Sequence, residues 1–148
     1  MKNYLYSQKK GLTEEDDLSN LTSKVGQDGV SFWLDVEGEN LKSDVTEVGE
    51  AFDLHPLTIE DALTLENRPI VDTYQNYLYI LARIPPGDWE TGEIETFQLS
   101  LVIGENFILT FHRRKLPPIE KLKTKISQNP ERYFGRGPDF IGYSILDE

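Results

Sequence analysis

Two adjacent carboxylates, Glu60 and Asp61, are the side chains of this sequence best suited to bind a divalent cation. They follow Pro56, and a proline favours the first turn of a helix, so both are expected on that helix. Consecutive helical residues point about 100° apart, so each would supply an oxygen to a site that another segment completes. Magnesium often uses only one or two carboxylates. Asp147, on the last predicted helix, is a further candidate. Without other context, a solvated acidic helix face is the commoner interpretation.

The two histidines, His55 and His112, give only a weak zinc signal because they lack the H-x-x-x-H spacing of a helical zinc site. His55 precedes the predicted helix and can cap it or pack there. His112 ends a predicted strand beside Arg113, Arg114 and Lys115. We expect structural roles for both histidines, and metal ligation or base chemistry are the alternatives.

One cluster of the sequence is basic: His112-Arg113-Arg114-Lys115, which Lys121, Lys123 and Lys125 extend. Such a cluster could meet phosphate or an acidic neighbouring subunit. In a chain this acidic, an internal salt-bridged surface is the favoured interpretation.

The composition narrows the classes of function. Fifteen basic and 26 acidic residues give a net charge of −11, which repels nucleic acid and anionic lipid and attracts cations. The chain has no cysteine, which excludes disulfides, thiolate zinc sites and a cysteine nucleophile. It also lacks the G-x-S-x-G, G-x-x-x-x-G-K and G-x-G-x-x-G signatures, so we do not expect an enzyme. No segment reaches the roughly 20 apolar residues of a membrane span, which predicts that the chain, as written, is soluble.

Four segments have the features of helices. The first carries apolar residues at i, i+3, i+4 and i+7, with Ser43 or Asp44 as its cap: Val45, Val48, Gly49 and Phe52. The others are expected from Pro56 to about Leu65, from Leu116 to Gln128, and from Gly137 onward. The last helix is expected still to be running at Glu148, as in a chain cut inside a helix.

Strand patterns fill most of the remainder. Residues 30–36 are rich in β-formers, residues 77–84 are almost continuously apolar, and residues 97–103 alternate before a turn at 104–106 and a strand at 107–111. The first 28 residues are expected to be the least structured, with a short strand at 4–6. Long apolar strands flanked by helices predict an α/β fold, a three-layer α/β/α sandwich with a mixed parallel and antiparallel sheet.

Several segments, in the right order, resemble the cytoplasmic domain of the CorA family of divalent-cation transporters. They are Trp33-Leu34-Asp35 with the helix after it, the Phe52-to-Asp61 segment with its His-Pro-Leu and Glu-Asp pairs, Arg68-Pro69 followed by Tyr74-Gln75-Asn76-Tyr77-Leu78, the hairpin 97–111, and residues 137–147. The likeness covers roughly residues 31–148. Ile70 stands where the family has lysine, a minor departure.

The resemblance implies that residues 1–148 are one cytoplasmic domain of a homopentameric magnesium transporter, which also handles cobalt or nickel. In that family, carboxylates between neighbouring subunits bind regulatory ions that hold the pore closed. The matching positions here are Asp61, with Glu60 and Asp147 as helpers. The family's stalk, its two membrane helices and its Gly-Met-Asn pore signature are absent from this sequence. We therefore expect a piece that cannot conduct ions, binds Mg²⁺ weakly, and reaches the cytoplasmic face of the membrane only through the missing helices.

Two other hypotheses stay open at this point. One is the same domain in a zinc-transporting relative, for which His55 and His112 are the only support. The other is a structural interaction module whose acidic face binds no ion.

Overall fold

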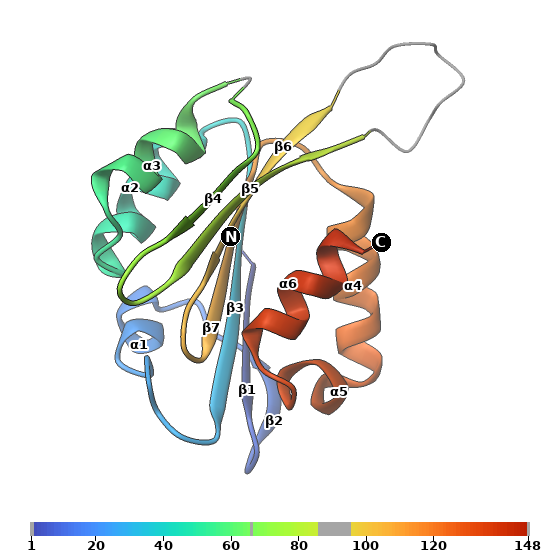
Figure 1. Cartoon of the computed structure of the whole chain (residues 1–148). Coiled ribbons are helices and arrows are strands. Elements are labelled where there is room, and N and C mark those ends of the chain that lie inside the picture. The colour runs from blue at the N-terminus through green and yellow to red at the C-terminus, as the bar shows by residue number, and fades with distance from the viewer. Residues whose placement is uncertain (1, 66, 86–95, 148) are drawn as a thin grey trace.

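A mixed sheet of seven strands lies at the centre of the computed structural model, which describes residues 2–65, 67–85 and 96–147 (Figure 1). The strand order is β2-β1-β3-β7-β6-β5-β4. In chain order, the strands are β1 (Lys2–Ser7), β2 (Gly11–Glu14), β3 (Val30–Glu37), β4 (Ile70–Thr73), β5 (Leu78–Ile84), β6 (Phe97–Ile103) and β7 (Phe107–His112).

One parallel pair joins two antiparallel groups in this sheet. β3 runs parallel to β7, whereas every other neighbouring pair is antiparallel. The register of the parallel pair sets Trp33 opposite Ile108, Asp35 opposite Thr110, and Glu37 opposite His112. The predicted mixed sheet is therefore confirmed.

Helices cover both faces of the sheet, as Figure 1 shows. One layer holds α1 (Leu18–Thr22), α2 (Leu41–Ala51) and α3 (Pro56–Leu63), and the other holds α4 (Pro117–Gln128), α5 (Pro130–Phe134) and α6 (Pro138–Leu146). The predicted three-layer α/β/α architecture is confirmed. Among the described helices, none combines the length and the apolar character needed to cross a bilayer.

The central strand β7 explains why two helical layers are needed. All six of its residues are buried, and successive side chains of a strand point to opposite faces. Phe107, Leu109 and Phe111 therefore join the apolar core under α2 and α3. Ile108 joins the second core under α4, α5 and α6, and the polar residues Thr110 and His112 face the same layer.

The N-terminal segment is more ordered than the sequence predicted. β1 pairs with both β2 and β3, and the Asp17 carboxylate caps α1 by accepting from the Ser19 amide at 3.0 Å. Tyr4 stacks on Trp33 with ring centroids 5.5 Å apart. Tertiary packing of this kind outweighs weak local propensity, so a polar sequence was a poor guide here.

The other differences concern short elements and helix ends. The short edge strand β4 and the five-residue helix α5 were not predicted. α2 begins at Leu41 after Asn40, which makes no side-chain cap bond, rather than at the predicted Ser43 or Asp44 cap. α6 ends at Leu146, with Asp147 as its C-cap. The predicted helix therefore ends before Asp147, and the part of the prediction that concerns Glu148 lies outside the described residues.

Candidate functional site

The helix α3 begins as the sequence predicted and carries the two candidate carboxylates in its last turn. Pro56 occupies the first turn, and the Leu57 amide donates to Nδ1 of His55 at 3.0 Å, so His55 caps the helix. Glu60 is exposed and Asp61 is half-buried, four and five residues further on. The structural role predicted for His55 is confirmed.

Asp61 has little compensation for its charge. Its Oδ1 lies 3.4 Å from the Asn67 side-chain amide, a long and weak contact. No Lys, Arg or His of the described residues lies within ion-pair distance of the Asp61 carboxylate. Gln98 on β6 instead binds the main chain, donating to the carbonyl oxygens of Asp61 at 3.2 Å and Thr64 at 3.0 Å. The end of α3 is thus fixed to the sheet, and the Asp61 carboxylate takes no part in these two bonds.

Asp147 occupies the other helical layer, at the C-cap of α6. The sheet lies between α6 and α3 (Figure 1), so one chain does not bring Asp147 and Asp61 into one site. The two places nevertheless share an electrostatic property. Each puts acidic side chains at the C-terminal end of a helix that has no basic residue in its last turn. That end carries about half a negative charge from the aligned peptide dipoles, so both places attract cations.

The donor set fits magnesium in kind but is incomplete in number. Carboxylate oxygens are the ligands that hard divalent cations prefer. Within residues 2–65, 67–85 and 96–147, no three Asp, Glu, His or Cys side chains are placed to hold one ion together. A site at Asp61 therefore needs further ligands from water or from another segment.

A second group of charges, which the sequence analysis missed, is buried between the sheet and α4. Asp35 and His112 are both 1% exposed. Oδ1 of Asp35 accepts from Thr110 Oγ1 at 2.7 Å and lies 2.6 Å from Nε2 of His112. Oδ2 lies 2.7 Å from Nζ of Lys123 on α4, and the Trp33 indole donates to Thr110 Oγ1 at 2.9 Å. We call Trp33, Asp35, Thr110, His112 and Lys123 the buried charge network.

The hydrogen bonds of this network set the protonation of His112. Its Nδ1 lies 2.7 Å from the carbonyl oxygen of Arg114, and its Nε2 faces the Asp35 carboxylate. Both acceptors lack hydrogens, so both ring nitrogens carry a proton and the imidazole is charged. Burial alone would lower the pKa of His112, but the hydrogen bond and charge of Asp35 outweigh it and raise this pKa above its ordinary value.

The carboxylate is stabilised in turn. Burial alone would raise the pKa of Asp35, but the hydrogen bond and charge of His112, with the charge of Lys123, hold this pKa below its ordinary value. Lys123 has a raised pKa, because the charge of Asp35 outweighs the opposing effect of burial. The charges of the network are therefore one buried anion, Asp35, between two cations, His112 and Lys123. With both nitrogens of His112 engaged, this residue is not available as a zinc ligand.

One signal in the sequence could have revealed the network. Asp35 interrupts an apolar strand, between Leu34 and Val36. A charged side chain in a buried strand needs partners. Its partners lie more than 70 positions away: the register of β3 with β7 brings Thr110 and His112 near it, and the packing of α4 brings Lys123.

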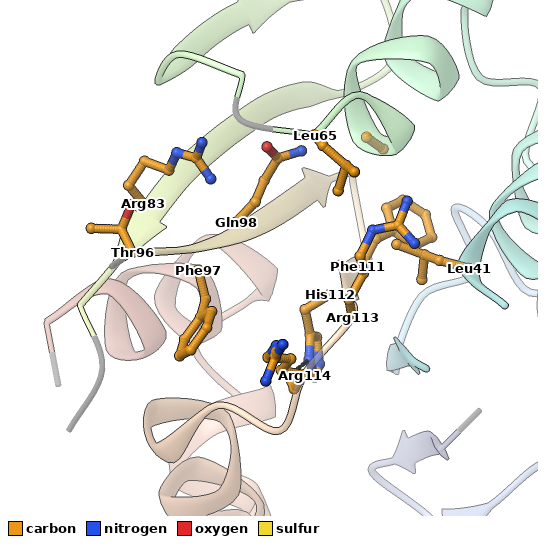
Figure 2. Close-up of a pocket in the computed structure, with 11 residues that line it drawn as sticks. Leu41, Leu65, Arg83, Thr96, Phe97, Gln98, Phe111, His112, Arg113 and Arg114 are labelled. Atoms are coloured by element: carbon orange, nitrogen blue, oxygen red, sulfur yellow. Dashed lines mark hydrogen bonds between the residues drawn. The ribbon is translucent and has the colours of Figure 1, made fainter. Parts of the chain in front are cut away.

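A pocket of about 250 Å³ opens between the end of α3 and the adjoining ends of β5, β6 and β7. Figure 2 shows Arg83, Gln98, Arg113 and Arg114 around it, with Phe97 on its wall. Of the basic cluster, Lys123 is salt-bridged as predicted, but Arg113 and Arg114 form no ion pair with a described carboxylate. The prediction of a salt-bridged surface thus holds for Lys123, and no described carboxylate fulfils it for Arg113 and Arg114.

Comparison with known proteins gives a consistent family match. The family described as CorA-like Mg²⁺ transporter protein matches residues 28–147. The cobalt/magnesium transport protein CorA of Thermotoga maritima is 30% identical over 115 residues, which are 78% of this chain and 33% of that protein. The candidate metal ion transporter YfjQ of Bacillus subtilis is 31% identical over 139 residues, 92% of this chain and 41% of that protein. The chain thus spans between a third and about two fifths of the length of these relatives.

Solved structures share the fold. The CorA magnesium transporter from Methanocaldococcus jannaschii aligns with a TM-score of 0.70 at 20% identity, over 99% of this chain and 44% of that one. The cytoplasmic domain of ZntB from Vibrio parahaemolyticus aligns with a TM-score of 0.63 at 13% identity, over 86% of this chain and 49% of that one. Both likenesses concern the fold alone, so the choice between magnesium and zinc depends on other observations.

Proposed function

The chain belongs to the family of CorA-like Mg²⁺ transporter proteins, and from this premise we propose that it is the cytoplasmic, divalent-cation-sensing part of a Mg²⁺ and Co²⁺ transporter. Asp61 is the principal ligand in this proposal, and Glu60 and Asp147 assist. The ion is a regulatory signal here, and the described residues form no path for it.

One observation carries the proposal. The Asp61 carboxylate is half-buried at the C-terminal end of α3, and among the described side chains only the weak Asn67 contact at 3.4 Å offsets it. The helix end adds negative potential at the same place. A divalent cation there would neutralise both the Asp61 carboxylate and the negative end of the helix dipole. Cation binding at the end of α3 is therefore favourable.

The incomplete donor set supports a site shared between subunits. Because α3 and α6 lie on opposite faces of the sheet, carboxylates from two layers could meet only when identical chains pack side by side. We infer a homopentamer in the intact transporter, with Asp61 of each subunit facing its neighbour. Bound Mg²⁺ would then relieve repulsion across the interface and favour one of two assembly states.

The test is inhibition of transport by internal Mg²⁺ in the intact transporter reconstituted in vesicles. Asp61→Asn should raise the concentration for half-inhibition about tenfold or more, because a charge-assisted contact contributes about 1.5–3 kcal/mol. Co²⁺ uptake at low internal Mg²⁺ reports that the pore still works.

Asp44→Asn is the matched control. Asp44 is also a half-buried helical aspartate of the same layer, but it lies in the first turn of α2, where the helix dipole already compensates its charge. This variant should keep the inhibition of the wild type. If Asp61→Asn and Asp44→Asn both leave inhibition unchanged, the sensing role is wrong.

A further inference from the structure

We propose that the pocket beside the end of α3 binds a small oxyanion of the phosphate class through Arg83, Arg113 and Arg114. This inference is independent of the cation-sensing proposal, because it concerns different side chains and a ligand of opposite charge.

Two strands of the sheet supply these arginines. Arg83 comes from β5, whereas Arg113 and Arg114 follow the last residue of β7. β5 and β7 flank β6 in the sheet, so side chains far apart in sequence reach the same hollow (Figure 2). Leu65 and Phe97 supply apolar wall. Apolar walls with a few convergent polar groups are typical of ligand sites.

Among the described residues, the guanidinium groups have few hydrogen-bond acceptors. Arg113 reaches two carbonyl oxygens, those of Glu39 and Leu63, both at a long 3.4 Å. Arg114 lies over the Phe97 ring, 5.5 Å from its centroid. In the described part of the chain, no carboxylate pairs with Arg83, Arg113 or Arg114. Among the described residues, three arginines line one pocket without a carboxylate partner, which leaves their charge available to an anionic ligand.

The size of the pocket and the chemistry of arginine limit the ligand. A volume of about 250 Å³ is below the roughly 300–1,000 Å³ of pockets that take drug-sized molecules, which favours an inorganic-sized anion. The planar guanidinium binds phosphate oxygens in a bidentate manner. The net charge of −11 opposes an anion in the pocket only weakly, because salt at physiological strength screens charges more than about 8–10 Å away.

The experiment is calorimetric titration of the chain with sodium pyrophosphate, in EDTA and at fixed ionic strength, so that no divalent cation bridges the partners. The wild type should give saturable binding. The double variant Arg83→Gln/Arg114→Gln should bind at least about tenfold more weakly, because two charge-assisted contacts are lost.

Arg132→Gln is the matched control, since Arg132 also lies over an aromatic ring, 5.9 Å from the centroid of Tyr133 on α5. The affinity of this variant for pyrophosphate should stay within about twofold of the wild type, because Arg132 lies on α5 and does not line the pocket. Thermal melts followed by circular dichroism verify that each variant folds. Amide shifts on addition of pyrophosphate should be centred on residues 96–98 and 111–114.

The proposal is overturned if the wild type shows no saturable binding, if the double variant binds as the wild type does, or if Arg132→Gln loses as much affinity as the double variant. A failure of this kind leaves the role of Asp61 untouched, because no cation is present in the assay.

Discussion

Asp35 and Asp61 are aspartates on opposite sides of one sheet, and they differ in almost every physical respect. Asp35 is 1% exposed and has Thr110, His112 and Lys123 around it at 2.6–2.7 Å. Asp61 is half-buried and has one amide contact at 3.4 Å. The charge of Asp35 is compensated by cations inside the protein, whereas the charge of Asp61 has no cationic partner among the described residues.

The difference teaches which charges to associate with function. A buried carboxylate must be paired, because burying an unpaired one costs on the order of several kcal/mol. We therefore associate the buried charge network around Asp35 with the stability of the fold. A carboxylate near the surface can remain uncompensated at little cost, so its lack of a partner is compatible with a binding role. The two aspartates should respond to substitution in opposite ways.

The largest effect is expected from Asp35→Asn. It leaves the cations of His112 and Lys123 without their anion, and the new amide would place a donor against Lys123. Breaking a buried pair of this kind costs about 3–5 kcal/mol, measured as the free energy of unfolding in urea. A loss below about 1 kcal/mol, which is ordinary for a surface pair, would show that the network contributes little and would break the comparison.

A smaller effect is expected from pH. The raised pKa of His112 means that its contribution is complete below its ordinary value of 6.5 and is lost as pH rises through the raised value. The lowered pKa of Asp35 means that its contribution is complete above 3.8 and is lost as pH falls through the lowered value. The pair therefore stabilises the fold fully between pH 3.8 and 6.5.

Urea unfolding of the wild type and His112→Gln across pH 6–9 checks this. The stability of the wild type should fall above pH 6.5 more steeply than that of the variant, because only the wild type releases the proton of His112. Parallel curves would show that folding does not raise the pKa of His112.

The smallest effect is expected from Asp61→Asn without metal. The change removes an uncompensated negative charge from a helix C-terminus, so the free energy of unfolding should stay within about 0.5 kcal/mol of the wild type or rise slightly. With millimolar Mg²⁺, only the wild type should gain stability by mass action. A loss as large as that of Asp35→Asn would make Asp61 a structural residue and would end the contrast.

The architecture could be predicted because its signals are local. Pro56 set the start of α3, and the alternating and apolar runs located β3, β5, β6 and β7 within one or two residues. The short elements β2, β4 and α5 carry too few residues for a periodic pattern. They depend on neighbours that sequence alone does not place.

The candidate site divides in the same way. Glu60 and Asp61 could be chosen from their residue types and their helix, and the structure confirms only that they lie in the last turn of α3. The placement of Asp147 across the sheet from Asp61 could not be predicted, because the sequence does not show which face of the sheet each helix covers. The arginines of the pocket could be grouped only in part from the sequence. Arg113 and Arg114 are adjacent in sequence, but Arg83 joins them only through the strand order.

The parallel pair of β3 and β7 has a consequence for the uniqueness of the fold. A slip of two residues along this seam would keep every side chain on its own face, so the apolar residues alone discriminate weakly against it. Such a slip would move Asp35 away from Thr110 and set it opposite Ile108 or His112, next to groups that cannot replace its three partners. Burying Asp35 without its partners would therefore destabilise a sheet in the slipped register relative to the native one.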